Sequence, residues 1–166
     1  KSGLRELLRA VMAPEPFEAA FHEELLENLR LYYFIGGMPE AIEQYKQDRD
    51  LAKVRTIHSE ILAAYLMDIS KHASKTEAIK IAGVWNSIPG QLAKENKKFK
   101  FSGISENARA REYAEPIQWL AHAGLVHKCL SLKTPRLPLS GYCEENVFKL
   151  YLLDTGLLGA MLNLSQ

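Results

Sequence analysis

Apolar residues recur every three to four positions over most of the chain, a spacing that predicts helices rather than strands. The first apolar stripe covers positions 4–11 and ends before Pro14 and Pro16. A second stripe predicts a helix from about Phe17 to Ile35. The apolar positions of this second stripe are Phe21, Leu25, Leu29, Tyr32 and Tyr33.

Helix-ending and helix-starting residues follow the second stripe. Gly36-Gly37 should end that helix, and Pro39 should open a short one that ends near Lys46. After the polar linker at 47–50, a long helix is expected from Leu51 to about His72. Its apolar positions are spread widely enough to predict packing on two sides. They are Val54, Ile57, Ile61, Leu62, Tyr65, Leu66 and Ile69.

Shorter elements are predicted beyond this helix. A helix at Thr76–Asn86 should end at Ile88-Pro89, and a second helix should run from Pro89 to about Glu95. Phe99 and Phe101 alternate with lysines, which predicts a brief strand at 96–102. The side chains expected to face inward from the first of these helices are Ile79, Ala82 and Trp85.

A third helix is expected at Glu106–Ala123, with Ser105 as its N-cap and Gly124 just after its end. Pro116 falls inside it, and an uninterrupted helix would lose about 3 kcal/mol there, so a kink or a restart is expected near Glu115. Its inward face should carry Ala110, Ala114, Ile117 and Leu120.

Two strands, Leu125–Leu132 and Val147–Leu153, should form a hairpin, and Asp154-Thr155-Gly156 opens a last helix. The predicted fold is mainly α. Residues 1–73 are expected to form a helical bundle or lid-like extension. Residues 74–166 are expected to form a winged-helix (winged helix-turn-helix-like) domain with a small β-hairpin, on which the C-terminal helix packs.

The charge is unevenly distributed, although the chain of 166 residues has a net charge of only +1. Positions 71–136 hold twelve Lys and Arg against five Asp and Glu, a difference of +7, whereas both flanks are acidic. A basic segment between acidic flanks favours an anionic partner. The candidate nucleic-acid-binding residues in this segment are Lys94, Lys97, Lys98, Lys100, Arg109, Arg111 and Lys128.

Two interpretations of these residues remain open. Lysines that alternate with Phe99 and Phe101 could bind phosphates and stack bases, while Arg109 and Arg111 lie near the start of a helix that could enter the major groove of DNA. Alternatively, the lysines form a solvated face and both phenylalanines are buried against the hairpin.

No other chemistry is indicated by the residue spacing. The five histidines, two cysteines and paired glutamates form no metal set or nucleophile motif, so no catalytic, cofactor or metal residue is predicted. No apolar run is long enough for a membrane span. Two isolated thiols fit a reducing cytoplasm. Because the chain starts at Lys1 rather than at a methionine, we expect it to be part of a longer protein.

Several strings, taken in order, resemble the C-terminal region of predicted AAA-superfamily ATPases of bacteria and archaea, a region that carries a domain-of-unknown-function label. The resemblance covers nearly the whole chain. The strings are YFIGGMPE at 33–40, YLMDISK at 65–71, SIPGQLAKENKKF at 87–99, ARAREY at 108–113, Trp119-Leu120 with AGLV at 123–126, and FKLYLLDTGLL at 148–158.

The resemblance implies an ATP-binding AAA core upstream, with ATP and magnesium as its cofactors, and that core as a partner. These 166 residues contain no Gly-x-x-x-x-Gly-Lys-Ser/Thr phosphate loop, so the fragment is not expected to hydrolyse ATP by itself. Two functions are expected of an accessory region of this kind. It binds DNA through the basic winged helix, or it is an assembly or regulatory module that contacts the core, a protein partner or a second copy.

Overall fold

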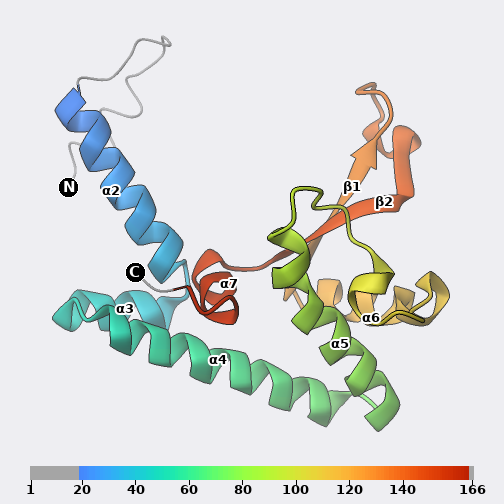
Figure 1. Cartoon of the computed structure of the whole chain (residues 1–166), viewed down its shortest axis with the longest axis horizontal. Helices are drawn as coiled ribbons and strands as arrows, with labels where there is room; N and C mark the ends of the chain where they lie inside the picture. Colours follow the sequence, from blue (N-terminus) through green and yellow to red (C-terminus); the bar gives the residue numbers. More distant parts are fainter. Residues whose placement is uncertain (1–18, 165–166) are drawn as a thin grey trace.

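The computed structural model describes residues 19–164, which form a mainly helical protein with one two-stranded antiparallel hairpin (Figure 1). The stripe at 4–11 lies outside the described residues. The helices are α2 (Ala19–Ile35), α3 (Pro39–Asp48), α4 (Leu51–His72), α5 (Lys75–Leu92), α6 (Ala110–His122) and α7 (Thr155–Met161). The strands are β1 (Val126–Leu132) and β2 (Cys143–Leu152), and two 3-10 turns are η1 (Phe101–Gly103) and η2 (Leu139–Tyr142).

The long helix α4 has the predicted bounds, and side-chain capping explains where it begins. Asp50 lies just before it and accepts hydrogen bonds from the backbone N–H groups of Ala52 and Lys53. The next helix, α5, begins with a capping box, in which Ser74 and Glu77 each accept a hydrogen bond from the other's backbone N–H. The capping box at Ser74 sets the short, non-helical corner between α4 and α5.

The helix α5 is continuous through Pro89, so the predicted break at Ile88-Pro89 is wrong. Proline removes one helical hydrogen bond, but its fixed φ is compatible with a helix, and Ile88 and Pro89 are both buried. The burial of this segment offsets the lost bond. Ile79, expected inside, is 66% exposed, whereas Ile81 is buried in its place.

The helix α6 begins at Ala110, four residues later than predicted, and Ser105 does not cap it. A capping box on Ser105 would need Glu or Gln three residues later, but that position is Ala108, so the sequence signal was incomplete. Pro116 is buried inside α6, and the helix does not restart near Glu115 as expected.

The end of α6 matches its prediction. Gly124 adopts a φ of +72°, its N–H donates to the carbonyl of Ala121, and the Leu125 N–H donates to the carbonyl of Leu120. This pattern is a Schellman motif, in which glycine takes the left-handed position without steric cost. The chain is therefore turned directly from α6 into β1.

The predicted strand at 96–102 does not form. Only one backbone hydrogen bond joins this described segment to the hairpin, from the N–H of Phe99 to the carbonyl of Phe148, and the chain then enters η1. The strand β2 begins at Cys143, four residues before its predicted start. In the hairpin Cys129 pairs with Lys149, and the register shifts between Leu130 and Ser131.

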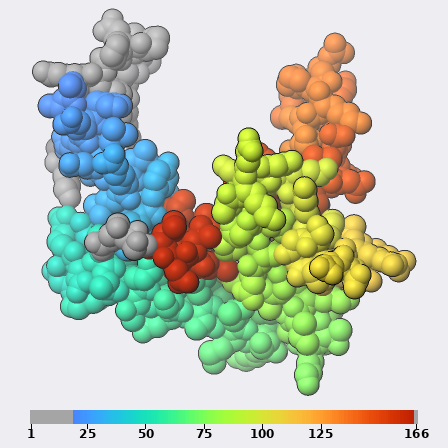
Figure 2. Space-filling model, in the orientation of Figure 1, coloured from blue at the N-terminus to red at the C-terminus, as the bar shows by residue number. Residues whose placement is uncertain are grey.

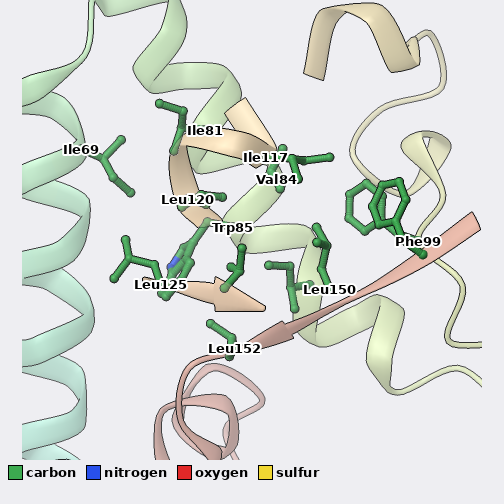
Figure 3. Packing of buried hydrophobic residues seen from close by; sticks show 13 residues of the cluster. Ile69, Ile81, Val84, Trp85, Phe99, Ile117, Leu120, Leu125, Leu150 and Leu152 are labelled. Carbon is green, nitrogen blue, oxygen red and sulfur yellow. The ribbon is translucent and has the colours of Figure 1, made fainter. Parts of the chain in front are cut away.

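One main hydrophobic core lies where α4, α5, α6 and the hairpin meet. Figure 3 shows Trp85, Val84, Leu120 and Leu150 directed toward one another from three of these elements. The full set of buried side chains in this core is Ile69, Ile81, Val84, Trp85, Ile88, Phe99, Ile117, Leu120, Leu125, Val126, Phe148, Leu150 and Leu152. Leu158 and Met161 of α7 pack against its edge.

Most of α7, however, packs against α2 and α4 rather than against α5 and α6 (Figure 1). The buried carboxylate of Asp154 accepts hydrogen bonds from the N–H of Leu157 at the start of α7 (2.9 Å) and from that of Gly37 (2.6 Å). Arg55 on α4 donates to the carbonyl of Gly156 (3.1 Å). We call this contact between the two ends of the chain the Asp154 junction.

His58 is fully buried at the Asp154 junction, next to Gly156. Its Nε2 donates to the Ile35 carbonyl (2.9 Å), and its Nδ1 has no partner among the described residues. Burial lowers the pKa of His58 below its ordinary 6.5, and the charge of Arg55 lowers it further, against the opposing effects of the Ile35 hydrogen bond and Asp154. Folding therefore disfavours the protonated form of this ring.

We expect the chain to lose stability as the pH falls below 6.5. The unfolded chain then binds a proton at His58 that the folded chain does not, so unfolding is favoured by up to about 1.4 kcal/mol per pH unit. Urea unfolding between pH 5 and 8 measures this slope. His58→Gln, which can still donate to Ile35, should remove this contribution, while His72→Gln at an exposed position should keep it. Equal slopes in both variants would contradict the prediction.

Candidate nucleic-acid interface

The basic loop at 93–100 is held in place by the side chain of Gln91 at the end of α5. Gln91 is buried; its Oε1 accepts a hydrogen bond from the Lys100 N–H (2.7 Å), and its Nε2 donates to the Ser87 hydroxyl (3.1 Å). A Cβ on Gly103 would lie 2.8 Å from this amide, so a larger residue there would require the Gln91 side chain to shift. The Gln91 side chain thus ties the loop backbone at Lys100 to the end of α5.

Phe99 anchors the loop rather than offering a free stacking surface. Phe99 is buried and stacks on Phe148 of β2, with ring centroids 5.5 Å apart and planes 17° apart. Phe101 meets Phe99 edge-on at 5.5 Å and lies against Tyr113 of α6 at 6.5 Å. A base cannot stack on Phe99 in this arrangement. For Phe99, the predicted alternative of burial against the hairpin is therefore the one observed.

The cationic side chains themselves are exposed. All seven predicted candidates are exposed, and within residues 19–164 none of them is in an ion pair. They are Lys94, Lys97, Lys98, Lys100, Arg109, Arg111 and Lys128. Solvated ammonium and guanidinium groups that are in no ion pair are available to an incoming phosphate without breaking one.

Lys128 lines a groove between α6 and the hairpin, which we call the α6 groove, with a volume of about 610 Å³. Its ammonium lies 4.5 Å from the centroid of the Phe148 ring, a cation–π contact. The lining contains both Lys128 and Glu145 beside a larger set of apolar residues. The apolar lining consists of Phe101, Ala110, Ala114, Ile117, Ala121 and Phe148. Ala110 and Ala114, predicted to face the core, are exposed in this groove instead.

Lys98 lines a second groove, which we call the outer hairpin groove, with a volume of about 520 Å³. Lys149 and Tyr151 of β2 line it as well, because side chains two apart on a strand share a face. This lining contains two lysines and no acid. The other lining residues include Asn96, Cys129, Leu130 and Ser131. Lys149 and Tyr151 were missed in the sequence because they lie beyond the basic segment.

The structure therefore brings only some of the candidates together. Lys98 joins Lys149 at one groove, Lys128 lies in the other, and Arg109 and Arg111 mark the start of α6 as predicted. The exposed face of α6 is not basic, because Glu112 and Glu115 accompany Arg111. Positive charge is concentrated on the loop and the hairpin rather than on α6.

Other kinds of site find no support in the described part of the chain. Within residues 19–164, no three His, Cys, Asp or Glu side chains converge in a way that could hold a metal ion. Cys129 and Cys143 are both free thiols. No helix in this range has the length and apolar content needed to cross a bilayer.

The chain belongs to a family defined as a domain of unknown function, DUF8612, whose sequence profile matches residues 26–166. This match covers every described helix from the middle of α2 onward and both strands of the hairpin. Neither a curated protein nor a solved structure matches the chain.

Proposed function

We propose that this chain is a non-catalytic accessory region that binds the phosphate backbone of DNA through the loop at 93–100 and the hairpin. The observation that carries the proposal is the outer hairpin groove, where Lys98 and Lys149 stand beside the exposed ring of Tyr151 with no acid in the lining. Two free cations and an aromatic face form the kind of surface that tracks a nucleic-acid strand.

The order of elements supports a winged-helix-type arrangement, in which α5 and α6 precede the hairpin and share one core with it. In this proposal the hairpin and the loop provide most phosphate contacts, and Arg109 and Arg111 contribute from the start of α6. The acids of α6 argue against a deep approach of that helix to the bases, so binding should depend little on DNA sequence.

We also propose that the chain is part of an AAA-type ATPase, which would bring an upstream core with ATP and magnesium. This proposal rests on the resemblance of the strings between positions 33 and 158. A reading frame that encodes a phosphate loop upstream of this region would support it, and a complete gene without one would count against it.

The DNA proposal is tested by the salt dependence of binding to a labelled duplex. We expect the logarithm of the affinity to fall linearly with the logarithm of salt concentration. Each lost phosphate contact should reduce this slope by about 0.9, so Lys98→Gln with Lys149→Gln should reduce it by about 2. Fluorescence anisotropy at several salt concentrations measures this.

The matched control removes the same charge elsewhere. Arg30→Gln with Lys46→Gln neutralises two exposed cations on α2 and α3, and its slope should equal that of the unmodified chain. If both pairs reduce affinity equally, binding depends only on net charge. If the Lys98 and Lys149 pair leaves affinity unchanged, the outer hairpin groove does not bind DNA.

A protein-contact module remains the second candidate function. The observation that favours it is the exposure of large apolar side chains at the turn of the hairpin and along α2. Contiguous exposed apolar surface on a soluble protein often marks an interaction site.

A further inference from the structure

The outer hairpin groove lies on the side of the hairpin that the protein does not use for its own packing. Along β2, Lys149 and Tyr151 are two residues apart and share one face, and both line the groove. Leu150, between them, is buried in the main core. Cys129 of β1 stands opposite Lys149 in the hairpin register and lines the groove as well. The side chains on this outer face are therefore open to a ligand.

The basic loop at 93–100 supplies a second wall of the groove. The Phe99 N–H donates to the carbonyl of Phe148 (2.9 Å), which places the loop along the edge of β2 that β1 does not pair. Figure 2 shows this loop (yellow-green) beside the hairpin (orange). The contact brings Asn96 and Lys98 into the groove lining. Asn96 Oδ1 accepts from the Lys98 N–H (3.0 Å), while its amide N–H groups have no partner among residues 19–164.

The groove is positively charged. Lys98 and Lys149 are exposed and, in the described part of the chain, neither is in an ion pair. The acids at the start of β2 do not line the groove. Glu144 is ion-paired with Lys133 (3.4 Å), and Glu145 lines the α6 groove instead. A phosphate that enters the outer hairpin groove therefore meets two cations and no opposing carboxylate.

Tyr151 offers an aromatic face within the same groove. The residue is 37% exposed, and among residues 19–164 its ring contacts no other aromatic ring, unlike the rings of Phe99 and Phe101. Bases in a duplex are already stacked and paired, so only an unpaired base can place its face on a ring inside a groove. The volume of about 520 Å³ lies within the range of roughly 300–1,000 Å³ that is usual for small-ligand sites. A nucleotide can therefore enter the groove, whereas a duplex can only cover its rim.

We infer that the outer hairpin groove binds an unpaired nucleotide, which makes single-stranded DNA the preferred ligand of this surface. The base stacks on Tyr151, and the Asn96 amide and the Ser131 hydroxyl of the same lining bind its edge. The phosphates on either side of this nucleotide contact Lys98 and Lys149. The inference rests on the proposed DNA-binding function and specifies the form of DNA that is bound. Because every base has an aromatic face, stacking here depends little on sequence.

The test compares one labelled strand without self-complementary sequence, alone and annealed to its complement, by fluorescence anisotropy at one salt concentration. The unmodified chain should bind the single strand at least about tenfold more tightly than the duplex. Tyr151→Leu should weaken single-strand binding at least about fivefold, the smallest contribution expected of one stacked base, and should leave duplex binding unchanged. Tyr151→Phe keeps the ring and should bind both forms like the unmodified chain.

A matched control and a second measurement protect this test from an effect of folding. Tyr142 is also 37% exposed and belongs to the connection between the strands, but it does not line the groove. Tyr142→Leu should therefore bind both forms like the unmodified chain. Independently of any variant, a single strand that carries 5-iodouracil should crosslink under ultraviolet light to the peptide that contains Tyr151. A crosslink pattern without this peptide would overturn the inference.

The outcomes separate a failure of this inference from a failure of the DNA proposal. Duplex binding as tight as single-strand binding, or equal losses in Tyr151→Leu and Tyr142→Leu, would overturn the inference. If Lys98→Gln with Lys149→Gln lowers duplex affinity while Tyr151→Leu changes nothing, the groove binds phosphates without a base, and only the inference fails. If the lysine pair leaves the affinity for both forms unchanged, the groove binds no DNA and both ideas fail.

Discussion

Replacing Trp85 by alanine is expected to lower the free energy of unfolding by about 3–5 kcal/mol. Trp85 is 1% exposed at the centre of the main core (Figure 3). Its ring meets Tyr65 of α4 edge-on, with ring centroids 6.2 Å apart. Alanine would leave a cavity between α4, α5 and the hairpin, since the surrounding helices are too constrained to close it fully. Urea unfolding monitored by circular dichroism measures the loss.

The loss of stability should depend on the size of the residue that replaces Trp85 and on the burial of the replaced position. Trp85→Phe keeps an aromatic ring and should lose clearly less stability than the alanine variant. Ile79→Ala removes an exposed side chain from the same helix and should change stability by less than about 0.5 kcal/mol. A loss below about 1 kcal/mol for Trp85→Ala would mean that the core can collapse around the gap, contrary to the packing described here.

Replacing Asp154 by alanine should lower the free energy of unfolding by about 2–4 kcal/mol, because its carboxylate accepts two separate backbone hydrogen bonds. It caps α7 through the Leu157 N–H, and it accepts from the Gly37 N–H, 117 residues away in the chain. Loss of a cap costs about 0.5–2 kcal/mol, and loss of a hydrogen bond to a charged group about 1.5–3 kcal/mol. Asp50→Ala at the start of α4 removes a cap alone and should cost less.

A double-mutant cycle with Gly36 tests whether this contact is specific. A Cβ on Gly36 would lie 2.2 Å from Oδ1 of Asp154, and Gly36 also has a φ of +72°. Gly36→Ala should therefore destabilise the unmodified chain more than it destabilises the Asp154→Ala variant, with a coupling of about 1 kcal/mol or more.

Gly124 provides the matched control for backbone strain. It has the same φ of +72°, but nothing lies within 4 Å of a Cβ placed on it. Gly124→Ala should show only the cost of the left-handed conformation, about 1–2 kcal/mol, and no coupling with Asp154→Ala. Equal losses for the two glycine variants would indicate that the close approach to Asp154 is relieved by a small shift.

Helix ends were predicted correctly where a capping residue or a glycine in the local sequence marks them. The bounds of α4 were predictable because Asp50 is a good cap and a polar linker precedes it, and Gly124 marked the end of α6 through its conformational freedom. The continuity of α5 through Pro89 was not predictable, because the rule for proline is local, whereas burial of Ile88 and Pro89 depends on elements far along the chain.

For the candidate site, the sequence predicted which residues are basic but not which of them share a surface. The sequence located the exposed lysines, yet Lys98 and Lys149 share a groove only through the hairpin register, which contains a shift between Leu130 and Ser131. Similarly, the repeat of Leu29, Tyr32 and Tyr33 predicted an apolar face but could not indicate whether the rest of the chain covers it. The spacing of apolar residues shows that one face of a helix is apolar, but it does not show which element packs against that face.

The Asp154 junction also sets the order in which a newly made chain can fold. The ribosome makes α2, α3 and α4 before α7, yet Gly37 and Arg55 find their hydrogen-bond partners only when Asp154, Gly156 and Leu164 emerge. The core of α5, α6 and the hairpin consists mostly of contacts closer in sequence, and it can close earlier. Within this region, α2 and α4 are therefore made early but complete their packing late, and during that interval their apolar surfaces are open to chaperones and proteases.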